Sequence, residues 1–189
     1  MADYVTDSKI GIDLTAVYAS TSAGSITVAP HKPGDRVNGN NNSVYMFARA
    51  ASDTTAGMVV AFGSFADSAA SSDAARMPTL QAVPANTTNA VVGGVAGDGL
   101  LGIAVNSCAS SYSTWWALQG TALRFNCKIA CQPNVPLYLT STAGSVDDAT
   151  VSSGYIAGLT IYTSATSASA PWGCAQPGFK VVHAQTSSS

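Results

Sequence analysis

The chain has 189 residues, of which 47% are hydrophobic and only 10% are charged, and all of its acidic residues are aspartate. A soluble domain typically carries about 25% charged residues, so the wet faces of long amphipathic helices cannot be built from this composition. The hydrophobic content excludes disorder throughout the chain, and a net charge of -2 gives no electrostatic reason to expect a nucleic-acid partner. A surface so poor in charge favours a protein that buries part of it in an assembly.

The first residues, MADYVTDSKIG, contain charges and no apolar run, which predicts the absence of a secretion signal. No segment is long and apolar enough to be expected to cross a membrane. We therefore expect a soluble protein made in a cytoplasm, where its four cysteines are reduced by default.

The N-terminal region, residues 1–20, is predicted to be an extended arm that leads into a first strand, because Ile10, Ile12 and Leu14 alternate with Gly11 and Asp13. Residues 30–43 are dense in proline, glycine and asparagine and are typical of a loop. The clearest strand follows in SVYMFARAAS. There Val44, Met46 and Ala48 share one face, while Tyr45, Phe47 and Arg49 share the other.

Further short strands are predicted along the rest of the chain. The segment MVVAFGSF forms one of them, and residues 67–79 form either a short helix or a surface loop. The other strands are expected near 80–83, 89–96, 100–105, 113–118, 121–129, 135–140, 154–163 and 178–184.

Short strands at this spacing predict an all-β fold, a compact antiparallel β-barrel or β-sandwich with an extended N-terminal arm and little helix. We expect the arm and first strand at 1–20, a single β-rich domain at 21–185 and a flexible tail at 186–189. Strand count alone does not choose between barrel and sandwich.

The sequence GDGLLG (97–102) matches the Gly-x-Gly-x-x-Gly pattern of dinucleotide-binding loops. Such a loop must open a helix, whose free N–H groups face the pyrophosphate. Here the strand-like IAVNS follows, so we interpret the glycines as a turn between strands and expect no cofactor.

The cysteines are Cys108, Cys127, Cys131 and Cys174, and the histidines are His31 and His183. The paired Cys-x-x-Cys spacing of a structural zinc site is absent, so buried free thiols are expected and no metal site is predicted. The adjacent Asp147 and Asp148 follow TSTAGSV and are expected to cap or tighten a turn. No catalytic acid–base or nucleophile pattern is visible, and an enzyme is not expected.

Trp115 and Trp116 lie side by side in YSTWWALQGTALRF. Neighbouring side chains in a strand point to opposite faces, so one indole is expected in the core and the other outward. The same unit is predicted to be strand–turn–strand, with Gln119-Gly120 at or near the bend.

Three stretches together resemble the small capsid decoration proteins of tailed bacteriophages, also called cement or head-stabilising proteins. They are NGNNNSVYMFARAASDTTAGMVVAF, YSTWWALQGTALRF and CQPNVPLYLTSTAGSVDDATVSSGYIAGLTI. The shared order is a strand, a turn with TAG, an aromatic strand ending in Q-x-G, and then LY-x-T-x-TAG-x-(V/L)-DD. The resemblance covers roughly residues 37–162, and the segments outside it match nothing in that group.

This resemblance implies a non-enzymatic protein on the outer surface of an icosahedral head, often a homotrimer. It would bridge neighbouring major capsid protein subunits after expansion and resist the pressure of the packaged DNA. The residues that matter would then be interface residues, and aromatic anchors dominate contact energy. The candidates are Tyr4, Ile10, Ile12, Leu14, Tyr45, Phe47, Trp115 and Trp116.

Two questions stay open at this level. The arm can add a strand to a capsid subunit, or residues 10–18 can pair within their own sheet. The competing functions are a head-fibre or receptor-binding virion protein, a small hydrolase, and a carbohydrate-binding β-sandwich in which Trp115 or Trp116 forms a sugar platform.

Overall fold

The regular secondary structure of the described residues is entirely β-strand, which confirms the all-β prediction. The computed structural model describes residues 12–19, 31–65, 79–87, 100–150, 155–165 and 168–182. Within them lie β1 (Arg36–Asn38), β2 (Val44–Ala50), β3 (Val59–Phe65), β4 (Thr79–Pro84), β5 (Leu101–Ala104), β6 (Ser113–Arg124), β7 (Leu137–Leu139), β8 (Val146–Asp147), β9 (Tyr155–Ile161) and β10 (Trp172–Val182). These parts of the chain contain no helix that could span a membrane.

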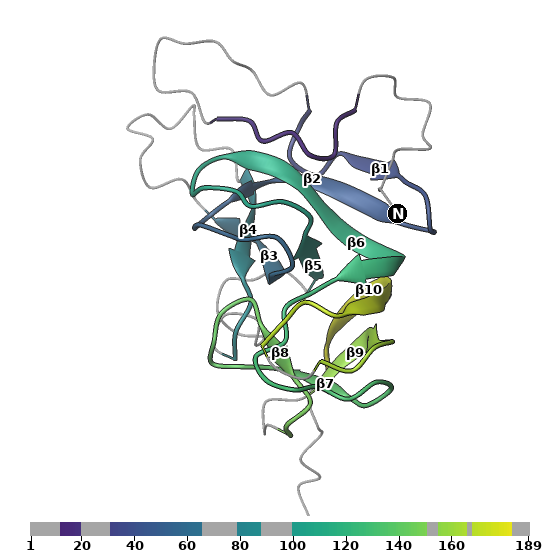
Figure 1. Ribbon diagram of the computed structural model, residues 1–189. Helices are drawn as coiled ribbons and strands as arrows, with labels where there is room; N and C mark the ends of the chain where they lie inside the picture. The colour runs from purple at the N-terminus through teal and green to yellow at the C-terminus, as the bar shows by residue number, and fades with distance from the viewer. Residues whose placement is uncertain are drawn as a thin grey trace, which may run out of the picture.

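Five of the strands close into a barrel. The hydrogen-bonded order is β2-β4-β3-β5-β6, and β6 also pairs with β2 to complete the ring. The pairing of β2 with β4 is parallel, and the other four pairings are antiparallel. Closure removes the free edges that an open sheet would expose, and β1 adds to β2 outside the ring (Figure 1).

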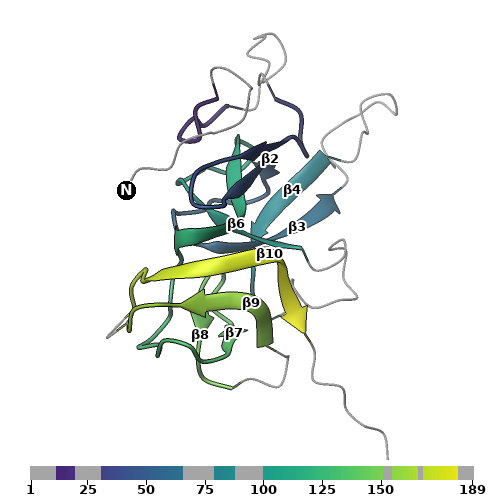
Figure 2. The same cartoon turned by 90° about the vertical axis from the view of Figure 1, so that its right-hand side faces the viewer.

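The long strand β6 joins the barrel to a second group of strands. Its first part pairs with β2, and its last part pairs with β10, after which β9, β7 and β8 follow in order. Figures 1 and 2 show β7, β8 and β9 on the side of β10 away from the barrel. One continuous strand therefore holds the barrel and this second sheet together.

The barrel interior is filled by alternate residues of its five strands: Met46, Ala48, Ala50, Val60, Phe62, Ala82, Ala104, Trp116 and Leu118. The many alanines leave room for the indole of Trp116, which is completely buried. Its Nε1 donates a hydrogen bond to the carbonyl oxygen of Ala48 at 3.0 Å. Gly102 contributes no side chain where the ring of Phe62 lies, since a Cβ there would stand 2.5 Å from Phe62 Cε2.

A second, larger core covers the outside of the barrel and continues into the second sheet. On the barrel, this outer core includes Trp115, Tyr45 and Phe47. In the second sheet, it includes Leu137, Leu139, Ile156 and Phe179. The rings of Tyr18, His31, Phe47 and Trp115 meet edge to face, with centroids 4.9 to 6.2 Å apart. Segments that precede the barrel in the sequence therefore seal its outer aromatic surface.

The predicted strands 80–83, 100–105 and 154–163 are found with boundary shifts of a few residues. The predicted turn between two strands at Gln119-Gly120 is wrong, because β6 runs unbroken from Ser113 to Arg124, although its pairing shifts register on either side of these residues. The shifts lie opposite Val44–Tyr45 of β2 and opposite Gly173–Ala175 of β10. Such β-bulges bend a strand without ending it. Two further differences are β1, which lies inside the predicted loop 30–43, and β10, which begins at Trp172 rather than near residue 178.

Leu101 and Gly102 are the first two residues of β5, so the end of GDGLLG is strand and opens no helix. Several predictions fall outside the described residues. These are Tyr4, Ile10, the helix or loop at 67–79 except for Thr79, which begins β4, the strand at 89–96, His183 and the tail at 186–189.

Candidate functional site

The four aromatic residues predicted to supply an interface are all inside the fold. Tyr45, Phe47, Trp115 and Trp116 are buried. The expectation that one indole of the Trp115–Trp116 pair faces outward is wrong, because both faces of this sheet are covered. Trp116 points into the barrel, and Trp115 points into the outer core. Neither ring offers a surface to a partner or a platform to a sugar.

The described part of the arm lies against its own barrel. Leu14 is 7% exposed within the outer core, and Ile12 packs against that core. Two side chains of the barrel bind the backbone of this segment. Asn106, just after β5, donates from Nδ2 to Leu14 O at 2.6 Å, and Thr114 of β6 donates from Oγ1 to Ala16 O at 2.9 Å. Tyr18 makes an isolated bridge with Ser113, and no longer strand forms over 12–19. Ile12 and Leu14 therefore stabilise their own fold.

An exposed row of large side chains lies elsewhere, across the junction of β6, β10 and β9. Trp172 stands opposite Arg124 of β6. On its other side the Tyr162 N–H donates to Trp172 O at 2.9 Å, directly after the end of β9. Arg124 Cζ lies 4.6 Å from the centroid of the Trp172 ring, within the range of a cation–π contact. We call Arg124, Trp172 and Tyr162 the aromatic row.

Strand alternation explains why the aromatic row faces solvent. The neighbours Leu123 and Ile161 point into the outer core, so the next residue on each strand must point away. Gly173, the residue after Trp172 on β10, faces the opposite side of the sheet, where a Cβ would collide with the Thr160 carbonyl and the Phe125 ring. As a result, Trp172 is 37% exposed and Tyr162 is 50% exposed.

Cys174 lies next to the aromatic row on the same face of β10. It forms a hydrogen bond with the Tyr162 side chain, and this bond raises the pKa of Tyr162. The thiol of Cys174 is free and half-buried.

A groove of about 360 Å³ runs beside the aromatic row. Arg124 and Trp172 form one wall, and Ile103, Ala104 and Ala56 lie on the barrel side. Arg124 is the only ionisable side chain among the residues that line this groove. Apart from Arg124 and Trp172, the described lining residues are aliphatic or glycine, so the groove is suited to binding by stacking and apolar contact.

The cysteines agree with the prediction of free thiols, and Cys108, Cys127 and Cys131 are buried. Burial raises the pKa of Cys108 to about 11. Burial is also the main cause that raises the pKa of Cys127 and of Cys131. Thiols that resist ionisation are poor nucleophiles, so these three lack the activation of a catalytic cysteine.

The predicted turn role of Asp147 is confirmed, because its Oδ1 accepts a hydrogen bond from Ala149 N at 3.3 Å. Asp148 instead bonds to a segment 16 residues earlier in the chain, where its Oδ2 accepts a hydrogen bond from Gln132 N at 2.9 Å.

Sequence reasoning missed the aromatic row. Trp172 lies outside the stretches that carry the resemblance, and the sequence pattern places the start of its strand near residue 178, whereas β10 begins at Trp172. The signal was present as Trp172-Gly173, a large aromatic beside a residue without a side chain. Its neighbours across the sheet, Arg124 and Tyr162, could not be paired with it before the strand order was known.

Comparisons with known proteins return little. No known protein family matches the sequence, and no curated protein matches it either. A solved structure, the N base of head fiber gp8.5 in bacteriophage phi29, is similar with a TM-score of 0.46 and 13% sequence identity. The similarity covers 75% of this chain and 99% of that chain. At this level the similarity carries no conclusion about function.

Proposed function

We propose that the chain is a non-enzymatic structural protein of a phage particle. It binds the outer surface of the head through the aromatic row and cements neighbouring major capsid protein subunits, as a homotrimer. The observation that carries the proposal is an exposed row of Arg, Trp and Tyr on one face of a β-sheet beside an apolar groove. The resemblance to decoration proteins and the 10% charge content support the same assignment.

The chemistry of the aromatic row suits an interface. Tryptophan, tyrosine and arginine are the residues most enriched among those that dominate binding energy at protein interfaces. Here the row is held across three strands, so little side-chain entropy is lost when a partner covers it. Three copies in a trimer would present three such rows, and modest contacts then reinforce one another through effective concentration.

The second candidate is a head-fibre or receptor-binding protein of the virion that recognises a glycan. The exposed Trp172 ring favours it, because an aromatic face packs on the apolar face of a sugar while Arg124 beside it donates to hydroxyl groups. In this case the groove, rather than the whole row, is the binding element.

The test compares Trp172→Ala with Tyr112→Ala. Tyr112 is 38% exposed, close to the 37% of Trp172, but precedes the opposite end of β6, a strand of 12 residues. Arg124, the residue opposite Trp172, lies twelve residues after Tyr112, so at about 3.3 Å per residue the two sites are separated by at most roughly 40 Å of strand. Purified protein is mixed with expanded, undecorated heads, and the bound copies and the heat resistance of the heads are measured.

We expect Trp172→Ala to weaken head binding by about 30-fold, corresponding to a loss of about 2 kcal/mol for a central interface residue. Tyr112→Ala should bind as the unmodified protein does. Unmodified protein that stays monomeric and binds no head would refute the cement function. Saturable binding of host-surface glycans, abolished by Trp172→Ala, would then identify the second candidate as correct.

A further inference from the structure

Arg124 carries a positive charge that no acidic group balances within the described residues. Its side chain is exposed, and its Cζ lies 4.6 Å from the centroid of the Trp172 ring. The described residues give this guanidinium no ion pair and no hydrogen bond. A cation–π contact attracts the guanidinium but supplies no negative charge, so its N–H groups remain available to a partner.

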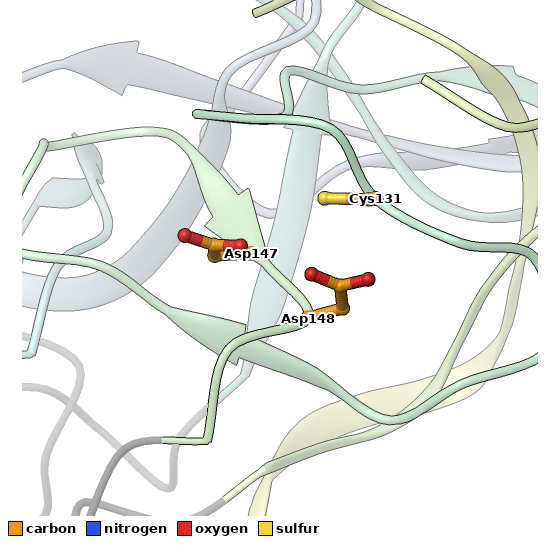
Figure 3. Close-up of side chains that lie close together, drawn as sticks. All are labelled: Cys131, Asp147 and Asp148. Carbon is orange, nitrogen blue, oxygen red and sulfur yellow. The ribbon is translucent and has the colours of Figure 1, made fainter. Parts of the chain in front are cut away.

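The aspartates of the described residues are engaged in other parts of the fold. Each of them accepts a hydrogen bond from a backbone N–H, at 2.7 to 3.3 Å: Asp13, Asp35, Asp53, Asp147 and Asp148. Figure 3 shows Asp147 and Asp148 beside Cys131. None of these carboxylates pairs with Arg124, so a carboxylate for Arg124 comes from outside the described part of the chain.

Apart from the Trp172 indole, Arg124 is the only polar side chain among the described residues that line the groove. Alanine, glycine and larger aliphatic residues make up the rest of the lining. The backbone of Gly57 is already bonded, because its N–H donates to Ala104 O and its carbonyl oxygen accepts from Asn126 N, both at 2.7 Å. The groove therefore binds through apolar contact and one guanidinium.

These two features select the chemistry of the occupant. A guanidinium binds a carboxylate through two parallel N–H···O bonds, and the pair is strengthened where a partner excludes water around it. An apolar side chain beside that carboxylate would fill the groove, whose volume of about 360 Å³ suits a few side chains. A nucleic-acid backbone needs a patch of several basic residues, and the described lining contains one. The best fit is a short protein segment with an acidic and an apolar side chain.

Under the cement function proposed above, the partner is the major capsid protein. We propose that Arg124 receives an aspartate or glutamate carboxylate of that protein, while an adjacent apolar side chain of the same segment lies in the groove. This inference rests on the proposed function and specifies the chemistry that the capsid surface must present. The Trp172 ring would cover the ion pair on one side and exclude water from it.

The test compares Arg124→Gln with Lys128→Gln in binding to expanded, undecorated heads. Both variants remove one positive charge from an exposed side chain, but Lys128 does not line the groove. We expect Arg124→Gln to bind about 10- to 100-fold more weakly, because a hydrogen-bonded ion pair is lost, and Lys128→Gln to bind as the unmodified protein does. Added salt should weaken the unmodified protein more than Arg124→Gln, because ions screen the pair. Circular dichroism checks that both variants keep the fold.

Arg124→Lys identifies the partner group directly. Lysine keeps the charge but loses the planar fork, so binding should fall between that of the unmodified protein and that of Arg124→Gln. Heads carrying this variant are treated with a water-soluble carbodiimide, which joins an amine to a carboxylate in direct contact with it. We expect mass spectrometry to find position 124 joined to an aspartate or glutamate of the major capsid protein. The unmodified protein, which has no amine at this position, is the control.

The outcomes separate this proposal from the cement function. Equal binding of Arg124→Gln and Lys128→Gln to heads would overturn the carboxylate contact and leave the cement function standing. A cross-link from position 124 to a second copy of this chain would also overturn it, because the groove would then be a contact between copies. Unmodified protein that binds no head would refute both. Binding of acidic glycans in its place, lost in Arg124→Gln, would assign the groove to the glycan-binding candidate.

Discussion

Replacing each tryptophan of the Trp115–Trp116 pair by phenylalanine separates the two environments that these neighbours occupy. Both indoles are completely buried, so each substitution removes the same atoms from a close-packed site. The loss of packing is therefore similar in the two variants, and the difference between them reports on the indole N–H.

The hydrogen bonding of the two indoles differs. Trp116 Nε1 donates to Ala48 O at 3.0 Å, and the loss of this bond costs about 1 kcal/mol. Trp115 Nε1 is buried and finds no hydrogen-bond partner within the described residues. Removing an unsatisfied buried donor recovers about 1–3 kcal/mol. We therefore expect Trp116→Phe to destabilise the fold by about 2–4 kcal/mol more than Trp115→Phe.

Urea denaturation followed by circular dichroism measures both variants, with the free energy of unfolding taken from the midpoint at a constant m-value. Trp172→Phe is the control, because it changes an exposed ring and should stay within about 0.5 kcal/mol of the unmodified protein. Equal destabilisation by Trp115→Phe and Trp116→Phe, or a larger effect at Trp115, would refute this account of the two indoles.

Two further predictions concern the barrel. Gly102→Ala places a Cβ 2.5 Å from the Phe62 ring, and such overpacking should lower the free energy of unfolding by about 1–3 kcal/mol, measured in the same urea assay; an unchanged midpoint would show that the interior is loosely packed. Burial raises the pKa of Cys108 from 9.0 to about 11, so its contribution to stability is complete below pH 9 and is lost as the pH rises from 9 to 11, by up to about 2 kcal/mol. Cys108→Ala should flatten that part of the pH profile of unfolding, and an unaltered slope would contradict the assignment.

Much of the fold could be predicted because local pattern decides it. The alternation in Val44–Ala50 predicts β2 and its two faces, and the strands after it follow from similar runs bounded by turn residues. The interface could not be predicted in this way. A strand with alternating residues needs only one buried face, so the sequence allows Tyr45, Phe47 and Trp115 to be exposed anchors. The tertiary structure shows that β2 and β6 are covered on both faces, by the barrel interior and by the outer core.

The sequence by itself determined the all-β class, since composition and period-two alternation act through the nearest neighbours along the chain. Tertiary structure decided where the aromatic surface lies. Closure of the ring through β2 and β6 turned Trp116 inward, and the pairing of β6 with β10 and β9 brought Arg124, Trp172 and Tyr162 into one row. Cross-strand neighbours come from distant parts of the chain, and their register is set by packing and bulges that no local pattern records.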